Sequence, residues 1–255
     1  PEDGYQGEDI KDLAKEYADL NGDSLVNVSA EERKKALVDY ALPKNIKKMQ
    51  ADMEKYKIFY DKWFFESELH KSGAVKAVVD LLTKKGLTYE KDGAVWYKNK
   101  EVLTQKLLKE GKSQKYIDNL ELKDDVLIRQ NGNPTYFTAD IAYHKNKFDR
   151  GFTTLIDVWG ADHHGHVMRM KGAMDAIGYD GNKLNVVLMQ LVKLVKDGEL
   201  VKMSKRTGKA IQLGDLLDEV PVDSARFLFN TKEANTQMDF DLDLAVSQDN
   251  QNPVY

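Results

Sequence analysis

The chain has 255 residues, of which 42% are hydrophobic and 31% charged, a composition that excludes a disordered tail and a membrane-embedded protein. It contains no cysteine, which rules out disulfides and thiolate chemistry and favours a reducing, cytoplasmic location. The formal net charge of −4 means that a nucleic-acid partner would have to meet a local basic patch.

The two ends predict a piece of a longer protein. The first residue is Pro1 rather than Met, and the acidic start is unlike a signal peptide. The chain stops at Asn252-Pro253-Val254-Tyr255, where the sequence pattern of a further element is still incomplete.

The first third of the chain reads as helical. Apolar residues at a spacing of three and four predict a helix over residues 8–20. Ser29 followed by Glu32 is a capping-box pattern, which predicts the start of a long helical stretch toward Phe65. Pro43 is expected to kink or divide that stretch.

A short hairpin and a polar segment follow. Residues 72–85 predict an amphipathic helix, and Asp92-Gly93 between two apolar runs predicts a β-hairpin over residues 87–97. Residues 98–123 are polar with weak helical periodicity, and we interpret them as a peripheral insertion.

Strands and helices alternate after residue 124. This alternation predicts an α/β fold with a parallel sheet, in which ligands bind at the carboxyl ends of the strands. It also predicts two domains, residues 1–123 and 124–255. The expected strands are 126–128, 155–159 and 185–188, the helices 138–148, 164–177, 213–219 and 223–229, and a hairpin 191–201.

A basic loop is the first candidate site. Basic residues outnumber acidic ones between residues 193 and 209, around Lys202-Met203-Ser204-Lys205-Arg206. Cations on a Gly- and Ser-containing loop can follow charge as it develops on a phosphate. The alternative is a solvated hairpin tip with no ligand.

The second candidate is the strand end Trp159 to His166. Gly160 and Ala161 would let a ligand approach the backbone, and Asp162 could accept hydrogen bonds from ribose hydroxyls. Three histidines nearby leave zinc open as an alternative. Only His163 and His166 would share a helix face, however, and no cysteine supports them.

The third candidate is Tyr136 with Asp140. The two are four residues apart, so they project to the same side where a helix begins. A carboxylate beside an aromatic ring suits a guanidinium group. The alternative is an aspartate that only favours the helix N-terminus.

Several runs together resemble a known family. Residues 202–206 resemble the second signature of class I aminoacyl-tRNA synthetases, and Gly160-Ala161-Asp162-His163 resembles their ribose-contacting strand end. Residues 1–7, 134–144 and 236–245 resemble arginyl-tRNA synthetases in particular. The resemblance covers nearly the whole chain and implies a Rossmann-like parallel sheet with a helical and hairpin insertion in the N-terminal half.

The departures from the family concern missing parts. The first signature, the N-terminal tRNA-contacting domain and the helical anticodon-binding domain have no counterpart in these 255 residues. We therefore expect a central catalytic-domain fragment that is inactive alone.

The resemblance implies ATP-dependent attachment of arginine to tRNA(Arg) through an arginyl-adenylate, with Mg²⁺ arriving on ATP and no dedicated protein metal site. Lys202 and Lys205 would neutralise the triphosphate. Tyr136 and Asp140, assisted by Asp162, would bind arginine. The remaining implied ATP contacts are Gly160, Asp162, His163, Met189, Gln190, Met203, Ser204 and Arg206.

Three alternatives stay open at this stage: a non-catalytic synthetase-like binding module, a histidine-dependent metal enzyme, and another nucleotidyl-transferring enzyme. No membrane partner is expected.

Overall fold

The computed structural model describes residues 7–201 and 211–255. The chain divides into two compact units. Unit 1 is made of residues 1–61 and 192–255, and unit 2 is made of residues 62–191. In the described part of the chain, no helix is long and apolar enough to cross a membrane.

The packing units do not follow the expected division of the sequence. The boundary expected between residues 123 and 124 lies inside unit 2, between α6 (Gln114–Asp118) and β3 (Asp125–Ile128).

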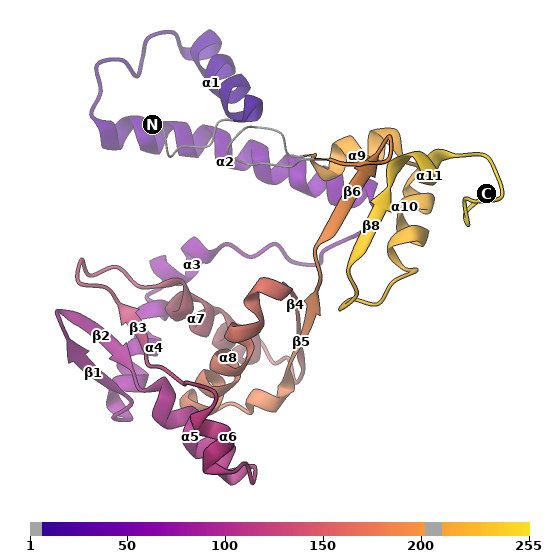
Figure 1. The fold of residues 1–255 in the computed structure, drawn as a ribbon. Helices are drawn as coiled ribbons and strands as arrows, with labels where there is room; N and C mark the ends of the chain where they lie inside the picture. The colour runs from indigo at the N-terminus through magenta and orange to yellow at the C-terminus, as the bar shows by residue number, and fades with distance from the viewer. Residues whose placement is uncertain (1–6, 202–210) are drawn as a thin grey trace. The chain divides into compact units, whose positions relative to one another are not determined.

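Two helices form the N-terminal part of unit 1. Helix α1 (Glu8–Asn21) lies against α2 (Ala30–Lys55) (Figure 1). The predicted capping box opens α2: Ser29 Oγ accepts from the Glu32 backbone N–H at 3.2 Å, and the Glu32 carboxylate accepts from the Ser29 backbone N–H at 3.0 Å.

Helix α2 is a single helix across Pro43, so of the two expected outcomes, a kink or a division, the division is excluded. One missing N–H leaves the rest of the hydrogen-bond ladder in place. The helix ends at Lys55, so the predicted helical stretch to Phe65 is wrong beyond that residue. Lys57 takes a φ of 61°, a left-handed conformation that stops a right-handed helix.

The C-terminal part of unit 1 is a small sheet covered by helices. Strand β6 (Val192–Lys196) pairs antiparallel with β7 (Glu199–Leu200), which confirms the predicted hairpin, and Asp197 and Gly198 both take positive φ in its turn. Strand β8 (Met238–Asp241) pairs parallel to β6. The helices that bury one side are α9 (Leu213–Glu219), α10 (Val222–Phe229) and α11 (Leu242–Val246).

Unit 2 begins with two helices and a three-stranded sheet. The predicted hairpin is confirmed as β1 (Thr88–Lys91) and β2 (Ala94–Tyr97). The expectation that residues 126–128 join a parallel sheet is wrong, because β3 pairs antiparallel with β2. A short apolar run can pair with a parallel or an antiparallel neighbour, and its sequence does not distinguish the two. The helices of this part are α3 (Glu66–Lys71), α4 (Ala74–Lys84), α5 (Asn99–Lys109) and α6.

The parallel sheet of unit 2 is formed by β4 (Leu155–Gly160) and β5 (Leu184–Met189). It confirms the α/β prediction. The crossover from β4 to β5 runs through helix α8 (His164–Ile177), flanked by the 3₁₀ turns η1 (Ala161–His163) and η2 (Gly181–Lys183). Helix α7 (Tyr136–Asp149) precedes β4 and shares a core with α8.

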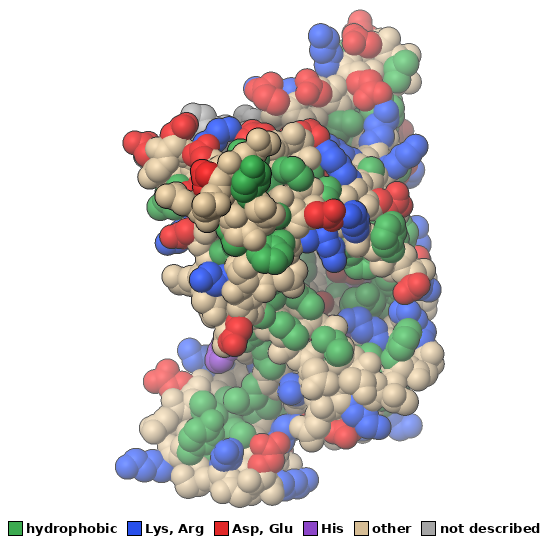
Figure 2. Space-filling view, turned by 90° about the vertical axis from the view of Figure 1, so that its right-hand side faces the viewer, with side chains coloured by type: hydrophobic (Ala, Val, Ile, Leu, Met, Phe, Trp, Pro, Cys, Tyr) green, Lys and Arg blue, Asp and Glu red, His purple; other side chains and the backbone are tan. Residues whose placement is uncertain are grey.

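The two faces of this sheet differ. Leu155 and Leu184 are buried in the core that α7 and α8 share, whereas Ile156 and Val158 are exposed on the other face. Figure 2 looks toward the side on which β4 and β5 lie in Figure 1, and hydrophobic side chains gather there between charged ones. Only one face of the parallel sheet is therefore packed against helices within unit 2.

Two glycines of α8 provide a matched test of the contact between α5 and α8. A Cβ at Gly172 would lie 2.6 Å from Leu103 Cδ2, whereas a Cβ at Gly165 would meet nothing within 4 Å. Gly165→Ala should raise the free energy of unfolding by at most about 1 kcal/mol, because the position is open and lies in the first turn of α8, where helix propensity counts less than in the interior. Gly172→Ala should lower it by about 1–3 kcal/mol through overpacking.

Urea denaturation of both variants measures the two changes. Equal effects of the same sign would contradict the described packing of α5 on α8.

Candidate functional site

The carboxyl edge of the parallel sheet carries most of the predicted nucleotide contacts. Gly160 ends β4 and is paired in register with Met189, the last residue of β5. Gln190 follows directly. The residues predicted from two separate strand ends thus lie side by side at one edge, where open α/β sheets bind ligands.

The turn after β4 presents two polar side chains to solvent. Asp162 and His163 are 82% and 60% exposed, with Asp162 Oδ2 3.9 Å from His163 Nε2. A Cβ at Gly160 would lie 2.5 Å from Asp162 Oδ1. Because glycine has no Cβ, the Asp162 carboxylate can occupy the space beside Gly160.

Helix α7 carries the predicted guanidinium contacts. It begins at Tyr136, two residues earlier than expected, and Asp140 follows one turn later. Tyr136 is 80% exposed, whereas Asp140 is 42% exposed and its Oδ2 lies 3.1 Å from His166 Nε2. Asp140 also lines a small cavity of about 250 Å³ together with Glu66 and Tyr143.

A group of rings joins these two regions. Trp159 lies 5.3 Å from His166 and 6.4 Å from His163, measured between ring centroids. Because His166 contacts Asp140, the turn after β4 and the first turns of α7 border the same group of side chains. In the sequence alone His166 suggests only a metal ligand, because its contact with Asp140 joins residues 26 positions apart and leaves no local pattern.

A buried ion cluster lies directly behind this group. His144 Nδ1 lies 2.7 Å from the Asp140 carbonyl oxygen, to which it donates, and His144 Nε2 lies 2.5 Å from Asp157 Oδ2. Lys147 Nζ donates to the other Asp157 oxygen at 2.8 Å. Burial alone raises the pKa of Asp157, but the bonds and charges of His144 and Lys147 outweigh it and hold that pKa below its usual value.

The histidines do not converge on one point. The ring centroids of His163 and His166 are 6.5 Å apart, while His164 lines a different cavity. Within residues 7–201 and 211–255, no group of three His, Asp or Glu side chains is arranged to hold a metal ion. The geometry of these residues gives the zinc alternative no support.

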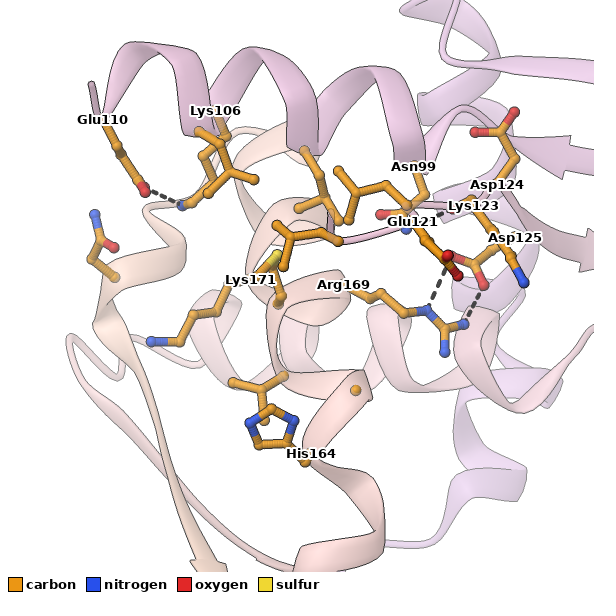
Figure 3. A pocket seen from close by; sticks show the side chains of 18 residues that line it. Asn99, Lys106, Glu110, Glu121, Lys123, Asp124, Asp125, His164, Arg169 and Lys171 are labelled. Atoms are coloured by element: carbon orange, nitrogen blue, oxygen red, sulfur yellow. Dashed lines mark hydrogen bonds and ion pairs between the residues drawn. The ribbon is translucent and has the colours of Figure 1, made fainter. Parts of the chain in front are cut away.

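The cavity that His164 lines is the larger one, about 920 Å³, between α5, the segment before β3, and α8 (Figure 3). Four of its charged lining residues are held in ion pairs. Arg169 contacts Asp125 through two nitrogens, and Lys106 lies between Glu110 and Asp175. One wall of the cavity belongs to residues 98–123, the segment interpreted as a peripheral insertion, and the opposite wall is α8; none of the predicted site residues lines it.

The residues of the predicted basic loop, Lys202, Met203, Ser204, Lys205 and Arg206, lie outside the described residues.

Comparison with known proteins gives a consistent result. Residues 8–249 match the family model described as tRNA synthetases class I (R), catalytic domain. An arginine–tRNA ligase from Caldanaerobacter subterraneus subsp. tengcongensis is 54% identical over 100% of this chain and 42% of its own length. One from Ruminiclostridium cellulolyticum is 52% identical over the same shares.

Among solved structures, a Campylobacter jejuni protein provisionally assigned as an arginyl-tRNA synthetase superposes with a TM-score of 0.81 and 36% identity. That match covers 100% of this chain and 51% of the other. The chain spans less than half the length of the curated relatives that it matches.

The buried ion cluster gives a prediction for stability. Asp157→Asn should lower the free energy of unfolding at pH 7 by about 3–5 kcal/mol, because it leaves His144 and Lys147 facing a neutral amide. The pKa of Asp157 is lowered on folding, so its contribution is present above the unfolded-state pKa of about 4 and is lost as pH falls through the lower folded-state value.

The difference between wild type and Asp157→Asn should therefore shrink below about pH 4, as followed by urea denaturation at several pH values. The exposed pair of Asp80 with Lys76 provides the control, since Asp80→Asn should change stability little. A wild-type advantage that stays constant into acid would contradict the ionised cluster.

Proposed function

The chain belongs to the family of class I tRNA synthetase catalytic domains of the arginine (R) type, and we propose that it supplies catalytic parts of an enzyme that attaches arginine to tRNA(Arg). The relatives that match its full length are arginine–tRNA ligases. The geometry of the described residues and the sequence pattern support the roles proposed for single residues.

The proposed reaction has two steps. A carboxylate oxygen of arginine attacks the α-phosphorus of MgATP, the bond to the bridging oxygen breaks, and pyrophosphate leaves with its magnesium. A ribose hydroxyl of the tRNA 3′ end then attacks the arginyl carbonyl and releases AMP. Neither step needs a protein nucleophile, so the protein acts by alignment and by stabilising charge.

The nucleotide side of the site is the edge formed by Gly160 and Met189. In this proposal Asp162 accepts from the ribose hydroxyls, while His163 and Gln190 border the adenosine. The exposure of the Asp162 carboxylate supports this assignment. Asp162 also lies between the end of β4 and the start of α8. The N-terminus of a helix favours a phosphate group, so a nucleotide bound there would bring its ribose near Asp162.

The arginine side is the first two turns of α7. The Asp140 carboxylate would accept from the guanidinium, and the ring of Tyr136 would lie against the planar cation. Asp162 lies two residues after Gly160, the end of β4, and its carboxylate is exposed. It would assist Asp140 by accepting a further hydrogen bond from the guanidinium. The single observation that carries the proposal is that Asp140 and the turn after β4 border the same group of rings.

Carboxylate recognition explains how the enzyme would choose arginine. Citrulline has nearly the same shape as arginine but no charge. It would leave Asp140 without its ionic partner, and sites of that kind reject the wrong ligand strongly. Lysine keeps the charge but lacks the planar fork of donors.

The basic loop completes the proposal. Lys202 and Lys205 would neutralise the phosphates, with Lys205 acting on the transition state, and Met203, Ser204 and Arg206 would shape the loop around ATP. We also propose tRNA(Arg) as the partner and the cytoplasm as the location, and membership of the family supports both.

Asp140→Asn in the full-length gene product should raise the arginine KM and relax discrimination against citrulline. The amide keeps the size but loses the charge, and it places a donor where the guanidinium offers only donors. The loss should cost about 1.5–3 kcal/mol, or roughly 10–150-fold in kcat/KM for arginine.

The control for this variant is Asp149→Asn, at the far end of the same helix, where Asp149 pairs with Lys145. Steady-state kinetics and thermal melting of both variants separate the two interpretations of Asp140. A destabilised Asp140→Asn enzyme with unaltered arginine KM and citrulline rejection would leave Asp140 as a helix-end residue only.

Lys205→Ala should slow adenylate formation by roughly 10²–10³-fold and change arginine affinity little, because the lysine is proposed to meet charge that develops in the transition state. Single-turnover pyrophosphate release measures the step. Lys196→Ala is the matched control, since Lys196 is exposed and paired with Glu219. An unchanged single-turnover rate for Lys205→Ala would remove the lysine from the mechanism.

A further inference from the structure

His166 lies in a fixed position beside Asp140. Its side chain is 17% exposed. The ring of Phe137 meets it edge-on, with centroids 5.5 Å apart, and the ring of Trp159 lies 5.3 Å away on a tilted plane. Packing between two large rings limits the rotamers that the imidazole can take, so the direction of its Nε2 is set by the core.

Nε2 is directed at one oxygen of Asp140. It lies 3.1 Å from Oδ2, and an ionised carboxylate can only accept, so the imidazole donates. In the described part of the chain, Oδ1 of Asp140 has no hydrogen-bond partner. One oxygen of the carboxylate is therefore held by the protein, and the other is left for a ligand.

The backbone of Asp140 is held as well. The imidazole of His144 donates to the Asp140 carbonyl oxygen, and His144 is fixed in turn by Asp157. Asp140 is thus restrained at its main chain by one histidine and at its carboxylate by another.

We propose that His166 is a positioning residue for arginine recognition, which orients the Asp140 carboxylate so that Oδ1 faces the guanidinium. This inference rests on the arginine-binding role proposed for Asp140. His166 acts without touching arginine: it removes rotamer freedom from Asp140 before binding, so that less conformational entropy is lost when the ion pair forms.

The arrangement around His166 agrees with this role. The other nearby carboxylate, Asp125, is already engaged by the Arg169 guanidinium. Arg169 itself lies over the ring of Phe137, 4.7 Å from its centroid. Since Arg169 occupies Asp125, the donor of His166 is directed to Asp140.

The test uses substitutions of His166 that keep or remove the donor. In the full-length gene product, His166→Phe retains a ring of similar breadth without a donor, and His166→Gln places an amide donor near the position of Nε2. His166→Asn has a donor with too short a reach, and it serves as the second donor-removing variant if His166→Phe does not fold. Titration calorimetry with L-arginine measures Kd, and thermal melting monitors folding.

We expect His166→Phe and His166→Asn to raise the Kd for arginine about 3- to 10-fold, the range of one net hydrogen bond. His166→Gln should stay within about 2-fold of wild type, and kcat at saturating arginine should be unchanged in all three. Because His166 acts through Asp140, His166→Phe should add nothing further in an Asp140→Asn background.

Three outcomes would overturn the inference. The first is an unchanged arginine Kd in His166→Phe and His166→Asn while Asp140→Asn raises that Kd. The second is a His166→Gln variant that binds arginine as weakly as His166→Phe does. The third is a double variant in which the effects of His166→Phe and Asp140→Asn on the Kd add up. If Asp140→Asn itself leaves arginine affinity unchanged, the arginine role of Asp140 fails instead. The failure of this inference and the failure of the proposed function are therefore distinguishable.

Discussion

The position of helix α7 on strand β4 depends on the buried ion cluster of Asp157, His144 and Lys147. Asp157 lies on the packed face of β4 and accepts from the His144 imidazole and the Lys147 ammonium group of α7. Replacing such a cluster with apolar side chains is often neutral for stability, but its hydrogen bonds have strong directional requirements. Its consequence here is register: it fixes which turn of α7 lies beside β4, and the turn carrying Asp140 then lies next to the residues that follow the strand.

The site follows from that register and from the parallel sheet. Two parallel strands bring Gly160 and Met189 to one edge, α8 begins just beyond that edge, and α7 presents Asp140 toward His166 of α8. A nucleotide at the strand ends and an amino acid against α7 would then be neighbours, as the formation of an adenylate requires. The larger cavity beside α5 contains none of these groups, and two ion pairs, Lys106 with Glu110 and Arg169 with Asp125, lie within its own lining. Size alone therefore does not identify the site.

Much of the fold could be predicted from the sequence, because the signals are local. The apolar runs of β4 and β5, the capping box at Ser29 and the Asp197-Gly198 turn all report on residues a few positions apart. The sequence misleads where a local pattern is compatible with several structures. Residues 126–128 pair with β2 rather than with a parallel strand. Helix α2 ends at Lys55, just before the left-handed Lys57, although the aromatic run after it continues the helical pattern. The contacts of His166 with Asp140 and of His144 with Asp157 join separate elements, so no spacing along the chain could reveal them. Likeness to a family identified candidate residues, and the structure added what holds one of them in place.

The central claim is that Asp140 and the edge formed by Gly160 and Met189 hold the two halves of one arginyl-adenylate. A crystal structure of the full-length gene product with a non-hydrolysable arginyl-adenylate analogue tests it most directly. The account predicts the guanidinium within hydrogen-bond distance of Asp140 Oδ1, His166 still on Oδ2, and the ribose beside Asp162. An analogue bound with its guanidinium away from α7, or bound in the cavity beside α5, would contradict the account.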